Sequence, residues 1–181
     1  MLKNNIQDAL NAQISLEASS SATYLSMASW CDRQGLRGCA AFFYAQSDEE
    51  RMHMLKIVHY INDMDGEAII PSVDKPASEF ESIQIIFKMV YEQEKHVTDS
   101  INRLMTLSQE GHDHATTVFL QWYVGEQREE EALVREILDK IRLIGDGSQS
   151  LYYIDKELER INKVRAAAEA AGADAGAEAK A

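Results

Sequence analysis

The sequence predicts an all-α protein: an antiparallel four-helix bundle with a long crossover between its second and third helices and a short fifth helix. Composition is the first indication, because the 181 residues include only two Pro and nine Gly and are rich in the helix formers Ala, Leu, Glu, Lys and Gln. Periodicity is the second, since apolar residues recur every three or four positions along four long segments. A chain of this length is sufficient for one domain with a sizeable core.

The first predicted helix runs from about Asn5 to Gln34 and ends at Gly35, a residue type that commonly follows a helix C-terminus. The turn after it is too short for anything but a helical hairpin. The second helix therefore folds back and continues to about Asp65, stopping at Gly66. The positions of a helix that recur every three or four residues and are expected to face the core are called its inward line. In the first helix these are Ile6, Leu10, Gln13, Glu17, Ser20, Tyr24, Met27 and Cys31. The inward line of the second is Cys39, Phe43, Gln46, Glu50, His53, Ile57, Tyr60 and Met64.

A linker over residues 66–80 separates the second helix from the third, and Pro71 and Pro76 keep it from being helical. Fifteen extended residues reach roughly 50 Å, whereas a helix of 28 residues is about 42 Å long. The linker can therefore cross the full length of a bundle. Such a crossover would leave the helices before and after it parallel.

The third helix is predicted to begin at a capping box, Ser78-x-x-Glu81. It runs to about Glu110 and ends at Gly111. Its inward line is Ile83, Phe87, Val90, Glu94, Val97, Ile101 and Leu104. Glu94 is the only charged residue on that line.

The fourth helix is expected to be capped by His112 or Asp113 and to run to about Ile144. Its inward line is Thr116, Phe119, Tyr123, either Glu126 or Gln127, Glu130, Leu133, Ile137 and Ile144. The fifth helix is predicted over about Gln149 to Val164, with Leu151, Ile154, Leu158 and Ile161 as its apolar face.

The remainder of the chain is Ala-rich with small acidic interruptions. It is expected either to extend the fifth helix or to fray. The predicted organisation is thus a bundle with its fifth helix over residues 1–164, followed by an Ala-rich acidic tail over residues 165–181.

The net charge is −12, with 30 Asp and Glu against 18 Lys and Arg. This balance argues against nucleic-acid and anionic-membrane binding and suits cations. No apolar run approaches the roughly 20 residues of a membrane span, and the polar N-terminus predicts no signal peptide. Cys31 and Cys39 have no CxxC spacing and are expected to be reduced thiols of a cytoplasmic protein.

Each of the four long helices carries a carboxylate at a core position near its middle. These are Glu17, Glu50, Glu94 and Glu130. Hairpin turns would bring Glu17 within about one helical turn of Glu50, and Glu94 to the level of residue 129. His53 follows Glu50 by three residues and shares its face. Four carboxylates at one level of an apolar core would repel one another without cations, and this mix of oxygen and imidazole ligands suits iron, manganese or zinc.

Over essentially residues 1–162, the chain resembles the non-haem ferritins of prokaryotes. The resemblance rests on Glu17, Tyr24, Glu50, His53, Glu94, Trp122, Gln127 and Glu130. A bundle with a crossover and inward Glu and Glu-x-x-His ligands is the known architecture of ferritin-like carboxylate proteins. The resemblance implies a hollow cage of 24 subunits, with the fifth helix lining four-fold contacts and a ferric mineral inside.

The resemblance also implies a ferroxidase centre that binds two iron ions per subunit. Glu17, Glu50 and His53 would hold the first iron, and Glu50, Glu94 and Glu130 the second. The expected function is iron storage and detoxification, in which dioxygen or hydrogen peroxide oxidises Fe(II).

Further residues are assigned by the same resemblance. Gln127 would lie beside the two ions and orient bound oxygen or a ligand. Tyr24 and Trp122 would be placed to donate electrons and limit the escape of peroxide. A third iron position next to the pair would use Glu49, Glu126, Glu129 and Glu130.

The sequence departs from the general di-iron pattern because it has no second Glu-x-x-His. Glu94 is followed at the third position by Val97, and Gln127 by Glu130. This difference disfavours bacterioferritin and the oxygen-activating di-iron enzymes, and it predicts a weaker second site through which iron passes. No haem is expected, since Met52 has the wrong offset for a haem ligand.

Two other classes of protein are alternative interpretations of the sequence. A di-iron enzyme that reduces peroxide or activates oxygen, as in rubrerythrin relatives, usually adds a Cys-rich electron-transfer module, and the chain has no CxxC pair. A structural cage or DNA-protecting miniferritin is the other, but miniferritins bind metal between subunits and lack a fifth helix. Simpler explanations also exist for single residues: a buried salt bridge for Glu50 with His53, core packing for Tyr24, and a solvated face for Glu126 and Glu129.

Overall fold

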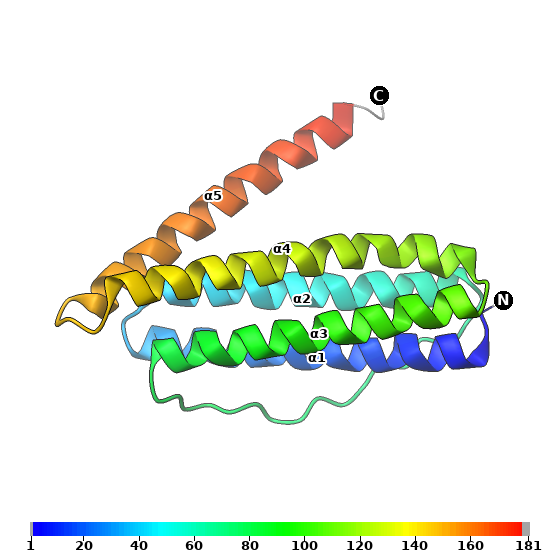
Figure 1. Ribbon diagram of the computed structural model, residues 1–181, viewed down its shortest axis with the longest axis horizontal. Helices are drawn as coiled ribbons and strands as arrows, with labels where there is room; N and C mark the ends of the chain where they lie inside the picture. Colours follow the sequence, from blue (N-terminus) through cyan, green and yellow to red (C-terminus); the bar gives the residue numbers. More distant parts are fainter. Residues whose placement is uncertain (1, 179–181) are drawn as a thin grey trace.

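The computed structural model of the protein describes residues 2–178, and side chains through residue 168. Its helices are α1 (Asn4–Arg33), α2 (Arg37–Asp63), α3 (Ile83–Glu110), α4 (His114–Ile144) and α5 (Ser150–Glu178). The described residues contain no strand. Figure 1 shows α1 to α4 side by side in one bundle, with α5 leaving it at an angle. The predicted all-α bundle is confirmed.

The long crossover is held along α1. At its beginning, the Asn11 side-chain amide donates to the carbonyl of Glu67 (3.0 Å) and its oxygen accepts from the amide of Ile69 (2.8 Å). Near its end, the Ser26 hydroxyl donates to the carbonyl of Ala77 (2.6 Å). The segment thus passes along most of the length of α1 (Figure 1), so α3 starts at the opposite end of the bundle and runs parallel to α2.

The start of α3 differs from the prediction. Ser82, rather than Ser78, is the N-cap, and its hydroxyl accepts from the amide of Ile85 (3.2 Å). The Arg33 guanidinium binds both the Ser78 carbonyl (2.7 Å) and the Glu79 carboxylate (2.8 Å). These contacts hold Ser78 in the crossover, so the cap passes to the serine directly before the apolar run.

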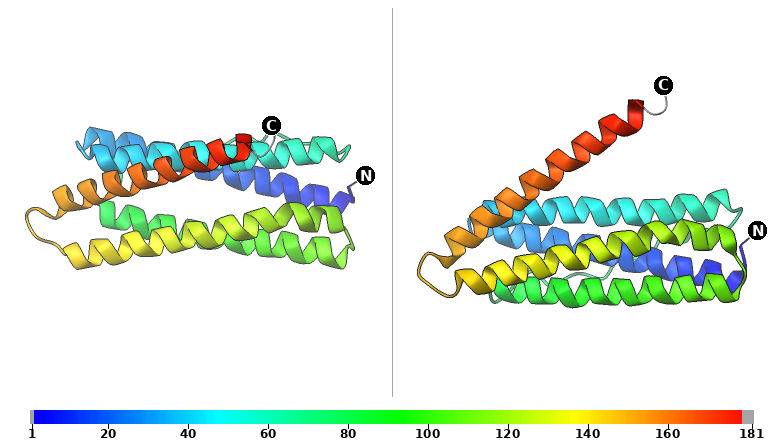
Figure 2. Two further views of the ribbon diagram at one scale, coloured as in Figure 1. Left: turned by 90° about the horizontal axis from the view of Figure 1, so that it is seen from above. Right: turned by 45° about the horizontal axis from the view of Figure 1, so that its top comes forward.

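The fifth helix is longer than predicted. It continues through Glu178, so the boundary expected after residue 164 falls inside α5. The tail was expected either to extend the fifth helix or to fray, and as far as residue 178 it extends the helix. Alanine has the highest helix propensity, and no proline interrupts this stretch. Figure 2 shows α5 starting beyond the end of α4 and running back over the bundle.

The base of α5 is docked tightly on the start of α2. The Asp155 carboxylate accepts from the backbone amide of Cys39 (2.9 Å). A Cβ added to Gly38 would lie 2.0 Å from the Asp155 carbonyl oxygen, so only glycine permits this approach. Ile154, Leu158 and Ile161 are buried at the same contact.

Two apolar clusters fill the two ends of the bundle. The Phe43 cluster lies where α5 joins, and it includes Phe42, Phe87 and Ile137. The Ile57 cluster lies at the other end. It includes Ile6, Leu10, Ile61, Ile101 and Leu120. Between the clusters, every helix of the bundle presents polar side chains to the interior. Among residues 2–178, no helix is both long and apolar enough to cross a bilayer.

Candidate metal centre

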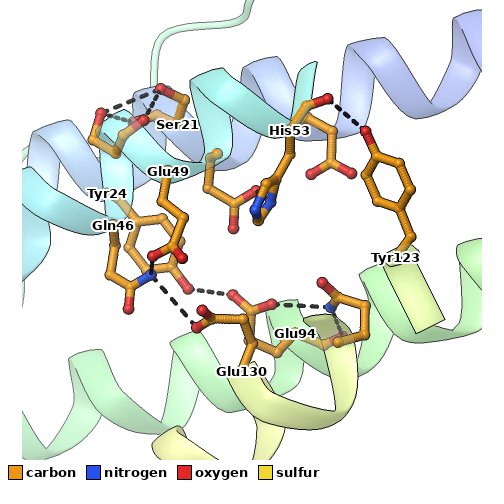
Figure 3. Close-up of polar contacts among 12 residues, drawn as sticks. Ser21, Tyr24, Gln46, Glu49, His53, Glu94, Tyr123 and Glu130 are labelled. Atoms are coloured by element: carbon orange, nitrogen blue, oxygen red, sulfur yellow. Dashed lines mark hydrogen bonds and ion pairs between the residues drawn. The ribbon is translucent and has the colours of Figure 1, made fainter. Parts of the chain in front are cut away.

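The predicted core carboxylates meet between the two apolar clusters, one from each helix of the bundle. Glu17 and Glu94 have no exposed surface, and Glu130 is 3% exposed. We call the inward polar set at this level the acidic layer: Glu17, Glu50, His53, Glu94, Gln127 and Glu130. Figure 3 shows Glu49, His53, Glu94 and Glu130 facing one another across the interior.

The side of the acidic layer on α1 and α2 has unsatisfied oxygens. Ligand atoms of Glu17, Glu50 and His53 all lie within 4.8 Å of one another, and His53 Nδ1 is 3.5 Å from Glu50 Oε2. Glu17 Oε2 and Glu50 Oε2 are buried and have no hydrogen-bond partner among the described residues. Burial of polar atoms without partners is costly, and a bound cation would supply the missing partner to both.

The α3 side of the layer is fully hydrogen-bonded. The Tyr24 hydroxyl donates to Glu94 Oε1, and Gln127 Nε2 donates to Glu94 Oε2 (3.2 Å). Gln127 is buried, whereas Glu126 beside it is half-buried. Of the two alternatives on the inward line of α4, Gln127 therefore belongs to the interior.

On the α4 side, the Glu130 carboxylate forms an ion pair with Arg165, a residue of α5. Arg165 Nη2 lies 2.8 Å from Glu49 Oε2 and 3.1 Å from Glu130 Oε1, and Nη1 donates to Gln46 Oε1 (2.7 Å). Gln46 Nε2 in turn donates to Glu49 Oε2 (3.0 Å). Arg165 was not among the predicted site residues, because it falls in the segment predicted as the Ala-rich tail. The signal was present, since Arg165 is the next position after Ile161 on the inward line of the fifth helix.

A second group of ligand type lies next to the layer and closer to solvent. Ligand atoms of Glu49, His53 and Glu126 lie within 4.8 Å of one another. This group borders an open groove of about 850 Å³ between α2 and α4, which connects it to the surface. Glu129 is not part of this group; its side chain is 70% exposed and pairs with Arg128 (3.3 Å).

Trp122 lies in the same groove. Its ring meets the His53 ring edge-on, with centroids 5.3 Å apart, and Lys56 Nζ lies 3.9 Å above it. Trp122 is thus in contact with a candidate ligand, while Tyr24 contacts another through its hydroxyl.

Burial makes the carboxyl groups of the layer weaker acids than exposed carboxyl groups. Desolvation and the charge of Glu50 raise the pKa of Glu17 well above its usual value, and desolvation also raises the pKa values of Glu50 and Glu94. Desolvation, with a smaller contribution from Glu49, raises the pKa of Glu130 to about 8, although the charge of Arg165 opposes this shift. Burial without a metal therefore favours the protonated form of these carboxyl groups, and a bound cation would favour the deprotonated form.

Comparisons with known proteins agree with this geometry. A family model described as Ferritin-like domain matches residues 7–144. A probable bacterial non-heme ferritin-like protein of Haemophilus influenzae is 41% identical over 162 residues, which cover 90% of this chain and 98% of that protein. The bacterial non-heme ferritin of Campylobacter jejuni is 41% identical over 161 residues, or 89% of this chain and 96% of the relative.

A solved structure is similar over the same part of the chain. The open-pore ferritin of the hyperthermophilic archaeon Archaeoglobus fulgidus superposes with a TM-score of 0.85 at 40% identity. The match covers 88% of this chain and 98% of that one.

Proposed function

The chain belongs to the ferritin family of iron-storage proteins, and on that premise we propose that its acidic layer is a ferroxidase centre within one subunit. The observation that carries the proposal is the pair of buried, unpartnered oxygens on Glu17 and Glu50 beside His53. Iron is the substrate of this centre and also the cargo of the protein. We propose two iron ions per subunit at the centre and no haem.

Glu17, Glu50 and His53 would bind the first Fe(II), because their ligand atoms already converge. Glu50, Glu94 and Glu130 would bind the second, so that Glu50 lies between the two ions. Tyr24 and Gln127 hold Glu94 in place by hydrogen bonds. A carboxylate held in this way keeps lone pairs for a metal, and its orientation is set by its hydrogen-bond partners.

The reaction is a two-electron transfer from two ions. Each Fe(II) gives one electron to dioxygen, which takes up two protons and becomes hydrogen peroxide, leaving two Fe(III). When hydrogen peroxide is the oxidant, it accepts the same two electrons with two protons and yields two molecules of water. The carboxyl groups of the layer release protons as Fe(II) binds, because a carboxylate must be deprotonated to act as a ligand.

The second site has only oxygen ligands, which suits transit of iron better than permanent retention. A third position is proposed at Glu49, Glu126 and Glu130, supported by the convergence of Glu49 and Glu126 near His53. The neighbouring groove between α2 and α4 would then serve as the path between the centre and the mineral.

We further propose that the chain assembles into a hollow cage of 24 subunits and functions in the cytoplasm. Exposed apolar side chains at the end of α4 and the start of α5 support assembly, because exposed apolar patches commonly mark contacts between subunits. They include Leu143, Leu151, Tyr152 and Tyr153. No nucleic-acid or membrane partner is proposed, since the chain is strongly acidic.

Aerobic loading with Fe(II), followed by size-exclusion chromatography with iron and protein detected together, tests the proposal. The wild type should oxidise Fe(II) rapidly and elute as 24 chains of 20.4 kDa, roughly 490 kDa for a closed symmetric assembly, with far more iron than three ions per chain. The double variant Glu50→Ala with His53→Ala should lose the fast oxidation. The matched control is Glu92→Ala with His96→Ala, an exposed pair on α3, which should behave as wild type. Iron that stops at about two ions per chain on a small oligomer would instead indicate a di-iron enzyme.

A further inference from the structure

The Arg165 side chain, which no ligand assignment above includes, lies against the acidic layer. Its guanidinium contacts Gln46, Glu49 and Glu130 at 2.7, 2.8 and 3.1 Å. The side chain is only 25% exposed. These contacts overlap the ligand set proposed for the second and third ions and do not involve Glu17, Glu50 or His53.

The packing of α5 sets this position. Ile154, Leu158 and Ile161 are buried in the Phe43 cluster, and Arg165 follows them with the same helical spacing. The base of the helix is held by the Asp155 contact to the amide of Cys39. Seen from above, Figure 2 shows α5 crossing from the end of α4 toward α2, and Arg165 lies on this helix close enough to contact residues of both α2 and α4.

The carboxylate oxygens on the two sides of the layer therefore differ in how readily they can bind an added cation. On one side, Glu17 and Glu50 each have an oxygen with no hydrogen-bond partner. On the other, Glu130 Oε1 is bound by Arg165 and Oε2 accepts from Gln46 at 3.4 Å, while Glu49 Oε2 accepts from both Gln46 and Arg165. Arg165 Nη2 is shared between the two carboxylates, and a charge-assisted contact of this kind is stronger than a hydrogen bond between neutral groups.

We propose that Arg165 is an internal counter-cation that iron must displace before it occupies the positions at Glu49 and Glu130. The centre then fills in order, with the Glu17, Glu50 and His53 position first and the Glu130 side afterwards. Because binding of two competing cations is reciprocal, filling the later positions releases the Arg165 contact to α2. This inference rests on the proposed ferroxidase function.

Calorimetric titration of the assembled, metal-free protein with Zn(II) tests the order without any redox reaction. Arg165→Gln removes the charge and keeps most of the side-chain length. Arg160→Gln is the matched control, because Arg160 lies on the same helix and pairs with Glu157 (2.7 Å) away from the layer. The Glu50→Ala, His53→Ala double variant supplies the background of ions bound to the acidic surface.

In Arg165→Gln, the second and third ions should bind roughly tenfold more tightly, the effect expected for loss of a charge-assisted contact. Affinity for the first ion should stay at the wild-type value, and Arg160→Gln should match wild type throughout. If the later ions bind Arg165→Gln with unchanged or lower affinity while affinity for the first ion is unchanged, the proposed role of Arg165 is wrong but the ferroxidase centre stands. Absence of any Zn(II) binding above the double-variant background would overturn the ferroxidase centre itself.

Hydrogen exchange of α5 provides a second readout. In the wild type, saturation with Zn(II) should speed exchange of backbone amides within residues 162–168, because the side-chain anchor is lost. In Arg165→Gln, exchange of these amides should already be fast and should not respond to Zn(II). Slower or unchanged exchange in the wild type on Zn(II) saturation would contradict displacement of Arg165.

Discussion

The apolar clusters and the acidic layer lie in the interior of the same molecule but contribute to the free energy of folding with opposite sign. The Phe43 and Ile57 clusters bury large apolar side chains, which stabilises the fold by about 25 cal/mol per Å² of apolar surface. The acidic layer buries Glu17, Glu94 and Glu130 at nearly the same depth, which is unfavourable for each. The difference teaches that the ends of the bundle supply the stability that allows its middle to bind cations.

The largest effect should come from the centre of the layer. Glu50→Gln keeps the side-chain volume but removes an anionic ligand, so the initial rate of Fe(II) oxidation should fall at least about a hundredfold, measured by stopped-flow absorbance. The metal-free variant should unfold in urea at the same or a higher concentration than wild type, since a buried acidic group is lost.

A substitution in an apolar cluster should instead lower stability and leave the rate of oxidation largely unchanged. Phe43→Ala should cost about 3–5 kcal/mol of stability and leave the oxidation rate per folded chain within about twofold of wild type. If Glu50→Gln destabilised the metal-free protein as much as Phe43→Ala does, the contrast between the two regions would be wrong.

Metal loading should stabilise the protein through the layer alone. Zn(II) at a hundred times its dissociation constant should add about 2.7 kcal/mol to the free energy of unfolding for each bound ion, measured by thermal or urea unfolding. Phe43→Ala should gain as much as wild type, because its ligands are intact. Glu50→Gln should gain much less, and an equal gain would mean that the ions bind elsewhere.

The metal-free protein should lose stability as the pH rises from about 5 to about 8. The carboxyl pKa values of the layer are raised in the folded state, and that of Glu130 reaches about 8, so the folded state holds protons that the unfolded state releases. Stability is then greatest below the unfolded pKa and declines as the pH approaches the folded pKa, by an amount on the order of 2 kcal/mol.

Urea unfolding at several pH values without metal would measure this dependence. Glu130→Gln should make this dependence shallower, whereas Phe43→Ala should leave its slope unchanged, because it removes no acidic group. Stability that rises with pH over this interval in the metal-free wild type would contradict protonation of the layer.

The smallest effect should occur where the two regions meet, at Tyr24. Its ring stacks on Phe43 with centroids 6.1 Å apart, and its hydroxyl donates to Glu94. Tyr24→Phe should therefore cost about 1 kcal/mol of stability and slow oxidation by less than about tenfold. Tyr123→Phe, which loses a hydroxyl bond to the backbone carbonyl of His53 (2.7 Å), is the control and should change stability alone. Complete loss of oxidation in Tyr24→Phe would instead make Tyr24 a participant in the reaction.

Much of the fold and of the layer was predictable from local pattern. Helical spacing placed Glu17, Glu50 and Glu94 on inward lines, and short turns aligned them, because helix geometry gives a known rise per residue. The Glu126 and Gln127 alternative was not decidable in this way, since neighbouring residues are only about 100° apart on a helix and the inward line passes between them. Packing against α3 decided it, through the Gln127 bond to Glu94.

The sequence by itself determined the four helices of the bundle, the crossover and the level at which the carboxylates meet, because each depends on periodicity and chain length over short distances. Only the tertiary structure decided that Ser82 caps α3, that Glu129 faces solvent and that Arg165 reaches Glu49 and Glu130. The Ser82 cap follows from the Arg33 contacts that hold Ser78 and Glu79 in the crossover, and the Arg165 contacts likewise join segments far apart in the chain. Periodicity places Arg165 on the inward line of α5, but its contacts also depend on where α5 packs against α2, at the close approach of Gly38 and Asp155.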